Sequence, residues 1–256
     1  MADNLVHLER RDDVALLRLD RAPLNPLSTT LLEAIGEACD ELRRDASVKA
    51  VVVTGNDRAL AAGADVSEFT EPDAAPRVTA AFRGAFDALV AIPRPVIAAI
   101  EGFALAGGCE LALLSDFIVA GETAVFGLPE TTLGIFPGIG GTQLLPRVLG
   151  APLAKELIFT GRRLKVDEAK AAGLVNHVVP AGQARAKAEE IATAIAANGP
   201  VAVRQAKRAI MGGLDRDLES AINLAIEAYN VTVETEDRLE GVRAFNEKRQ
   251  PQFKGR

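Results

Sequence analysis

The chain of 256 residues has no tryptophan, one tyrosine and only two cysteines. Its core must therefore be built from Leu, Val, Ile, Ala and the ten phenylalanines. The cysteines, Cys39 and Cys109, each lie among apolar residues in segments with helical spacing. This setting favours buried free thiols over a disulfide. With 48% hydrophobic and 25% charged residues, the composition is that of a globular protein with a sizeable core.

An excess of positive charge and long apolar runs are also lacking. The net charge of −6 argues against a general nucleic-acid binder, which needs concentrated Lys and Arg. No run of eighteen apolar residues predicts a membrane span, and residues 1–11 are too polar for a secretory signal. We therefore expect a cytoplasmic protein. Residues 238–256 are locally basic, which indicates either a solvated helix and tail or contact with a small phosphorylated ligand.

Several catalytic motifs are missing. The sequence has no GxSxG, no HExxH and no paired CxxC. Its two histidines are His7, in the polar N-terminal segment, and His177, in a strand-like run where a structural or surface role is expected. Because neither lies in the segments described below, the acid–base groups available there are carboxylates. We expect no metal site.

Apolar runs rich in Val and Ile alternate with longer amphipathic stretches, which indicates an α/β architecture with mostly covered sheets. The predicted strands are Val14–Leu19, Ala50–Thr54, Val96–Ile100, Phe117–Ala120 and Leu174–Val179. The predicted helices are Thr29–Arg44, Thr79–Ala91, Gly108–Ser115, Pro152–Thr160, Gln183–Ala197, Pro200–Met211 and Leu218–Thr235. The chain becomes almost wholly helical after Pro180. We therefore predict a core over residues 1–180 and a helical region over 181–256.

Residues 93–115 combine a strand, a turn, a run of small residues and an apolar helix. Small residues over 104–108 let a ligand approach the backbone closely. The first turn of the helix offers unpaired N–H groups and a partial positive charge, and Glu110 lies in that turn. The pattern fits either a tight turn opening a helix or a site that binds a developing oxyanion.

Residues 58–69 place four small residues, 61–64, before Asp65. A glycine between alanines suits a turn whose N–H groups point outward. An ordinary loop capped by Asp65 fits the same pattern.

Residues 123–147 place Glu130 after a short extended run and then supply a glycine-rich loop before a helix. The loop is neither GxGxxG nor a Walker A sequence, so nucleotide binding of the usual kinds is rejected. A structural turn packed against a site remains an alternative interpretation.

Taken together, these segments resemble the crotonase family, the enoyl-CoA hydratase/isomerase superfamily. The matching motifs are AAGAD, GGCE, PE and LG-x-x-P-G-x-GGTQ-x-L-x-R, in that order, followed by the C-terminal AFNEKRQPQF. The resemblance covers essentially the whole chain. It implies a spiral of ββα units followed by a helical C-terminal region that builds trimers, usually paired as hexamers.

The resemblance also implies roles for four residues. The backbone N–H groups of Ala64 and Gly107 would form an oxyanion hole for the thioester carbonyl. Glu110 would activate the water that adds to C3 of a 2-enoyl-CoA, and Glu130 would deliver a proton to C2. No cofactor is expected, since coenzyme A is part of the substrate.

Arg58, Ala62, Asp65, Gly138 and Lys248 are the residues expected to contact the CoA or acyl part of the substrate. Two positions depart from the family pattern. Ser67 stands where many members have a lysine, which leaves Arg58 and Lys248 as the candidate cations near the CoA phosphates. Ala106 stands where a third glycine is common, and its small side chain predicts no loss of function.

Two other functions compete with a hydratase. One is a Δ3,Δ2-enoyl-CoA isomerase or another crotonase-type reaction, although many isomerases keep only the carboxylate that matches Glu130. The other is a non-catalytic RNA-binding homologue, which the acidic balance and both glutamates disfavour. The sequence does not specify the length or branching of the acyl group.

Overall fold

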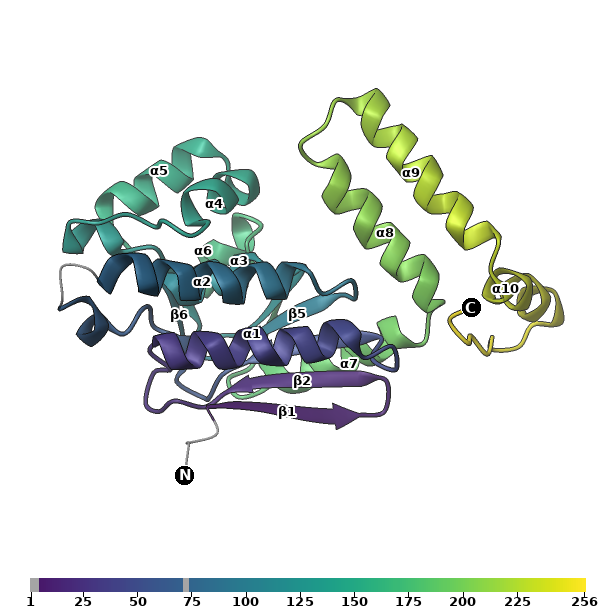
Figure 1. Ribbon diagram of the computed structural model, residues 1–256, viewed down its shortest axis with the longest axis horizontal. Helices are drawn as coiled ribbons and strands as arrows, with labels where there is room; N and C mark the ends of the chain where they lie inside the picture. The colour runs from purple at the N-terminus through teal and green to yellow at the C-terminus, as the bar shows by residue number, and fades with distance from the viewer. Residues whose placement is uncertain (1–4, 71–73) are drawn as a thin grey trace.

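Two sheets form the body of the protein in a computed structural model that describes residues 5–70 and 74–256 (Figure 1). The larger sheet has the order β1-β2-β3-β5-β7-β10, and the smaller has the order β4-β6-β8-β9. In the larger sheet only β1 and β2 pair antiparallel, and in the smaller only β8 and β9 do. The strands are β1 Val6–Arg11, β2 Val14–Leu19, β3 Ala50–Thr54, β4 Ala59–Ala61, β5 Val96–Ile100, β6 Phe103–Leu105, β7 Phe117–Gly121, β8 Val125–Gly127, β9 Leu164–Lys165 and β10 His177–Val179.

The helices complete repeated strand–strand–helix units. The pairs β3–β4, β5–β6 and β7–β8 each give one strand to each sheet before the chain becomes helical, which is the predicted spiral of ββα units. The α-helices are α1 Thr29–Arg44, α2 Ala74–Val90, α3 Gly107–Leu113, α4 Gly141–Leu149, α5 Ala151–Thr160, α6 Val166–Ala171, α7 Ala184–Ala196, α8 Pro200–Gly213, α9 Leu218–Val233 and α10 Glu236–Glu247. Two 3-10 helices, η1 Val66–Phe69 and η2 Glu130–Leu133, lie beside the site described below.

Both faces of the larger sheet are buried, which explains why its strands read as continuous apolar runs. In β3, Val51 and Val53 join the main core cluster, whereas Ala50 and Val52 face a second cluster. The second cluster is covered by α7, whose buried residues recur every fourth position as Ala184, Ala188, Ala192 and Ala196. Alanines on one helical face let α7 lie close against the strands.

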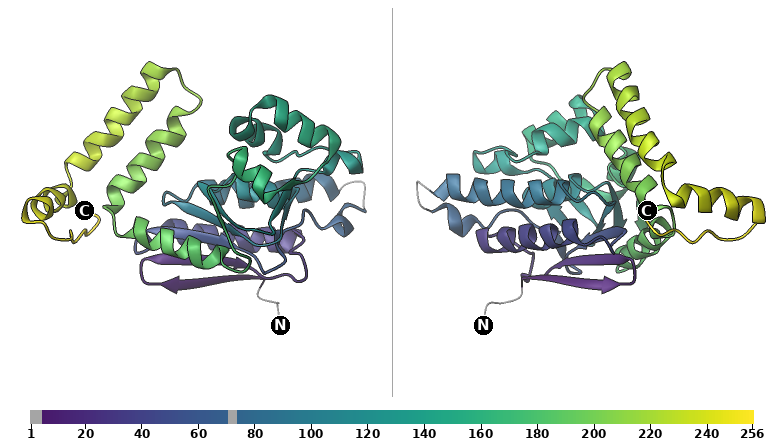
Figure 2. Two further views of the ribbon diagram at one scale, coloured as in Figure 1. Left: turned by 180° about the vertical axis from the view of Figure 1, so that it is seen from behind. Right: turned by 45° about the vertical axis from the view of Figure 1, so that its right-hand side comes forward.

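The C-terminal helices α8, α9 and α10 project from this body as an arm (Figures 1 and 2). The first helix after Pro180, α7, still packs on the larger sheet. Lys207 of α8 attaches the arm to the body through Asp116 Oδ2 at 2.7 Å and the Arg94 carbonyl at 2.9 Å. Within the described residues, no helix is both long and apolar enough to cross a bilayer.

One predicted strand is corrected, and the structure also places the cysteines and histidines. The strand predicted over Leu174–Val179 shortens to β10, because Leu174 and Val175 are buried within a turn. Both cysteines are buried free thiols, as predicted. His7 lies in β1, where its Nε2 is 3.0 Å from Asp20 Oδ2, and His177 is an exposed residue of β10.

A buried arginine joins the end of α1 to the sheet. The guanidinium of Arg94 donates hydrogen bonds to the carbonyl oxygens of Leu42, Arg43 and Val48 at 2.8–3.1 Å, and the residue is 5% exposed. The carbonyls of Leu42 and Arg43 lie in the last turn of α1, where a helix leaves them without partners, and Val48 lies in the loop that follows.

We expect Arg94→Met to lower the free energy of unfolding by about 2–3 kcal/mol, because it leaves buried acceptors unpaired. Urea denaturation followed by circular dichroism measures this change. Arg83→Met is the matched control, since Arg83 is paired with Asp87 on the exposed surface of α2 and should leave the midpoint unchanged. Equal midpoints for the two variants would contradict the role of Arg94.

Candidate active site

Glu110 is a buried carboxylate held by three consecutive backbone amides. It lies in the first turn of α3, as predicted, and is 2% exposed. Its Oε1 accepts hydrogen bonds from the N–H groups of Ile139 at 3.1 Å, Gly140 at 3.0 Å and Gly141 at 2.8 Å. Its other oxygen accepts no hydrogen bond from the described residues. The side chain is therefore fixed through one of its two oxygens.

The glycine-rich loop is built around this contact. A Cβ on Gly141 would lie 2.8 Å from side-chain atoms of Leu128 and Pro137 and 3.1 Å from Glu110 Oε1. Only glycine lets the backbone come this close. The sequence predicted a turn packed against a site here, but it gave no sign that the amide of Ile139 binds Glu110.

Glu130 is the second buried carboxyl group. It is the first residue of η2 and is 8% exposed. Its Oε2 is buried and has no hydrogen-bond partner among the described residues. The loop that begins at η2 ends at the amides that hold Glu110, so one segment connects the two glutamates.

The two carboxyl groups lie in different electrostatic surroundings. Burial raises the pKa of Glu110, and the three N–H bonds partly offset this rise. Burial also raises the pKa of Glu130, and the charge of Glu110 adds to the rise, which brings it to about 7. The three N–H bonds favour the ionised form of Glu110, whereas the charge of Glu110 favours the protonated form of Glu130.

Two backbone N–H groups beside the glutamates have no intramolecular acceptor in the described part of the chain. Leu27 pairs with the loop around Ala64, since its N–H donates to the Gly63 carbonyl at 2.8 Å and its carbonyl accepts from Asp65 N–H at 3.0 Å. This pairing leaves the Ala64 N–H unused. The Gly107 N–H opens α3, where no residue of the same helix can accept it.

Close packing brings together the two segments that carry these amides. A Cβ on Gly63 would lie 3.1 Å from the Cβ of Ala106, and a Cβ on Gly108 would lie 2.1 Å from the Ala61 carbonyl oxygen. The loop after β4 therefore rests directly on the start of α3. This juxtaposition places Ala64 and Gly107 beside each other, close to Glu110 on the first turn of α3.

Three other residues were predicted to contact the substrate, and they lie on two loops. Ala62 lies in the same loop, and its N–H donates to the Leu24 carbonyl at 3.0 Å. Gly138 is exposed on the loop between the glutamates. Asp65 accepts from Arg21 Nη2 at 2.6 Å and from Ser67, and these bonds, led by that of the Ser67 hydroxyl, lower its pKa. Both oxygens of the Asp65 carboxylate therefore have partners within the chain.

The two predicted cations are both exposed and lie on different parts of the chain. Arg58 is exposed and precedes β4, whereas Ala64 follows that strand. Lys248 is exposed at the end of α10, on the arm that projects from the body (Figures 1 and 2). Within one chain, Lys248 is not part of the site that holds Glu110. A role for it requires another copy of the chain.

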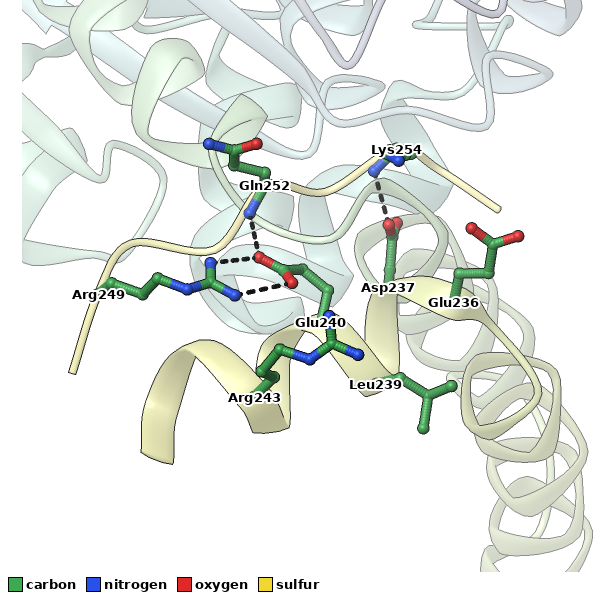
Figure 3. Close-up of a pocket in the computed structure, with 8 residues that line it drawn as sticks. All are labelled: Glu236, Asp237, Leu239, Glu240, Arg243, Arg249, Gln252 and Lys254. Carbon is green, nitrogen blue, oxygen red and sulfur yellow. Dashed lines mark hydrogen bonds and ion pairs between the residues drawn. The ribbon is translucent and has the colours of Figure 1, made fainter. Parts of the chain in front are cut away.

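Two cations of the basic C-terminal segment are paired with nearby carboxylates, Arg249 with Glu240 and Glu247, and Arg256 with Glu236. A cavity of about 450 Å³ lies between α10 and the last residues (Figure 3). There Arg249 donates to both oxygens of Glu240 at 2.6 and 3.0 Å, and this hydrogen bonding lowers the pKa of Glu240 to about 2. Asp237 accepts from the N–H groups of Lys254 and Gly255. The contacts around this cavity hold the last residues against α10, on the arm and away from the two glutamates.

Neither this cavity nor a second one of about 500 Å³ between α1 and α2 contains Glu110 or Glu130. The candidate site is therefore defined by two buried carboxyl groups, Glu110 and Glu130, and by the nearby N–H groups that have no acceptor. Within residues 5–70 and 74–256, no group of three or more His, Cys, Asp and Glu side chains is arranged to hold a metal ion.

Comparison with known proteins identifies the family. Residues 9–256 match the family model described as enoyl-CoA hydratase/isomerase. The chain therefore belongs to the enoyl-CoA hydratase/isomerase family, as its sequence motifs indicated, and it is an enzyme.

The similarity between this chain and individual relatives extends over nearly the whole length of each. The chain is 45% identical over 260 residues to YngF of Bacillus subtilis, a protein named as an enoyl-CoA hydratase/isomerase. The match covers 100% of both chains. It is 41% identical to a short-chain-enoyl-CoA hydratase of Clostridium acetobutylicum, over 99% of each chain. A crystal structure of an enoyl-CoA hydratase from Bacillus anthracis superimposes with a TM-score of 0.96 at 43% identity and covers 98% of this chain and 100% of that one.

We expect Glu130 to lose its proton as the pH rises through about 7, well above the ordinary range of a glutamate. Glu110→Gln should lower this pKa, because it removes a neighbouring negative charge. Carbon-13 NMR of glutamate-labelled protein measures the titration, and Glu130→Gln assigns the signal.

Glu33→Gln, on the exposed face of α1, serves as the control and should leave the titration of Glu130 unchanged. A Glu130 signal that titrates between pH 4 and 5, the range of an ordinary glutamate, would contradict this account of the site.

Proposed function

We propose that the protein hydrates 2-enoyl-CoA thioesters to 3-hydroxyacyl-CoA products. The observation that carries the proposal is the unequal pair of buried glutamates, one fixed by three amides and the other with an unpartnered oxygen. Hydration needs a base that activates water and an acid that protonates carbon. Glu110 is the base in this proposal, and Glu130, whose pKa burial raises to about 7, is the acid.

The Ala64 and Gly107 N–H groups bind the thioester carbonyl in this proposal. As water attacks C3, negative charge moves through the conjugated system onto the carbonyl oxygen. Donors fixed in advance stabilise that charge by about 2.7–4 kcal/mol each. Both N–H groups lack another acceptor among the described residues, so binding the carbonyl breaks no existing bond.

The proton balance follows from the two carboxyl groups. Glu110 removes a proton from water as the new C3–O bond forms, and Glu130 gives its proton to C2. The C2–C3 π bond is lost, and the product gains the elements of one water molecule. Transfer of a proton from Glu110 to Glu130 restores the starting state. These steps use no metal or redox cofactor, and coenzyme A enters as part of the substrate.

An oligomer completes the proposal. The arm exposes large apolar side chains on successive turns, and these include Ile210, Leu214, Leu218, Ile222, Ile226 and Phe245. An exposed apolar surface of this kind marks a protein–protein interface. We infer a homo-oligomer, either a trimer or a dimer of trimers, in which Lys248 of one copy reaches the CoA of another. The cytoplasmic location expected from the sequence remains a prediction.

Substitution of each glutamate tests the reaction. We expect Glu110→Gln and Glu130→Gln each to lower kcat for hydration by at least about 100-fold, with much smaller changes in KM. Glutamine keeps the size of glutamate but cannot exchange the proton. Loss of conjugated-thioester absorbance, measured on 2-enoyl-CoA substrates of increasing length, follows the reaction.

The same two variants separate hydration from isomerisation. Moving a double bond needs one proton shuttle, so Glu130→Gln should be the more damaging change for a 3-enoyl-CoA. If Glu110→Gln hydrates normally while Glu130→Gln is inactive towards both substrates, the two-carboxylate reaction is wrong and a one-carboxylate isomerisation takes its place.

A second prediction concerns Lys248, which has φ 55° at the end of α10. Lys248→Asn removes the charge while suiting the left-handed backbone. We expect a higher KM for CoA thioesters at low salt and a smaller effect as salt rises, since ions screen exposed charges. Lys254→Asn is the control, because Lys254 is an exposed cation of the same segment. An unchanged KM at low salt would remove Lys248 from the site.

A further inference from the structure

The segment between β2 and α1 supports the loop that carries the Ala64 amide. Asn25 is fully buried, and its Nδ2 donates to the carbonyls of Ala59 at 3.1 Å and Leu60 at 3.0 Å. One residue earlier, the Leu24 carbonyl accepts from the Ala62 N–H. The beginning of the Ala64 loop is therefore fixed by side-chain and backbone contacts to this one segment.

Arg21 holds the other end of the same loop. Its Nη1 donates to the Pro26 carbonyl at 2.7 Å, and its Nη2 donates to Asp65 Oδ2 at 2.6 Å. Pro26 and Asp65 flank the Leu27–Ala64 bridge on its two sides. One planar guanidinium thus joins both strands of the bridge.

Asp65 has no other donor that could replace Arg21 at Oδ2 among the described residues. The other oxygen of Asp65 already accepts from the N–H and hydroxyl groups of Ser67. Oδ2 accepts from Arg21 alone among the described residues. The Arg21 N–H donates to Asn25 Oδ1 at 2.8 Å, which connects the two anchors of the loop. Removing the guanidinium would release Asp65 and leave the bridge held by its two backbone bonds.

We propose that Arg21 is a positioning residue that aims the Ala64 N–H at the thioester carbonyl. The inference rests on the proposed role of that amide in the hydratase reaction. Arg21 makes its observed contacts to Pro26 and Asp65, so its effect passes through the backbone between them. An oxyanion donor acts mainly on the transition state, and a displaced donor should lower kcat more than it raises KM.

The test compares two arginines of the same region. Arg21→Met removes the guanidinium and keeps a long side chain. Arg18→Met is the matched control, because Arg18 has a similar exposure, 26% against 30% for the side chain, and also pairs with an aspartate, Asp20, at 2.8 Å. We expect Arg21→Met to lower kcat by about tenfold or more, the scale for misplaced catalytic groups, with KM changed less than about threefold. Arg18→Met should keep the wild-type kcat.

A chromophoric cinnamoyl-CoA thioester provides a readout independent of turnover. Hydrogen bonding to its carbonyl draws electron density along the conjugated chain and shifts its absorption to longer wavelength. We expect wild-type enzyme and Arg18→Met to shift the bound thioester fully, Arg21→Met to shift it less, and Arg21→Lys to lie between. Lysine keeps the charge but lacks the rigid fork that holds two acceptors.

The two readouts distinguish failure of this inference from failure of the proposed function. A wild-type shift without hydration would overturn the hydratase reaction, and the Arg21 variants would still be judged by their shifts. A full shift and normal kcat in a folded Arg21→Met protein would overturn the positioning role. Equal losses in Arg21→Met and Arg18→Met, with equally lowered melting temperatures, would overturn it as well, because general destabilisation would then account for the effect.

Discussion

The contact between Glu110 and three backbone amides is the interaction on which the rest of the site depends. A carboxylate that is 2% exposed is costly unless hydrogen bonds replace its water. The amides of residues 139–141 provide this replacement at one oxygen. Because they are consecutive, they fix the start of α4 and the end of the loop from η2. The position of Glu130 is thereby tied to that of Glu110, although 20 residues separate them.

Burial without matched hydrogen bonding is what makes the glutamates chemically different. Both lose water, and both pKa values rise, but only Glu110 gains three N–H donors. The partial positive charge at the start of α3 also favours an anion at Glu110. Cys109, the neighbour of Glu110, lies in the same low-dielectric region, and burial raises the pKa of its thiol to about 12. It remains a neutral apolar residue, so the ionisable chemistry of this turn belongs to Glu110.

The sequence predicted those parts of the fold in which local pattern and packing agree. The bounds of Ala50–Thr54 and Val96–Ile100 were correct, because β-branched and small apolar residues fill strands that are buried on both faces. The three-residue strands β4, β6 and β8 were missed, since they are too short to show a period. The apolar run at Leu174 was predicted as strand because burial in a turn leaves the same composition. Glu110 and Glu130 were found through family motifs, whereas the amide of Ile139 and the guanidinium of Arg21 were missed, because contacts across 29 and 44 residues leave no local pattern.

The two departures from the family pattern follow from the packing around Ala64 and Gly107. Ala106 has φ 50° and ψ −126°, a conformation that costs a residue with a Cβ of the order of 1–3 kcal/mol. Its N–H donates to the Gly127 carbonyl at 2.8 Å, and its carbonyl accepts from Cys109 and Glu110, so the strained peptide is held on both sides. Its Cβ fits because the facing residue, Gly63, has none. Ser67, where many members have lysine, donates its hydroxyl to Asp65 at 2.6 Å and so occupies the carboxylate oxygen that Arg21 does not bind. Ala106 and Ser67 are thus both accommodated by contacts beside Ala64 and Gly107, and Ser67 supplies no cation there.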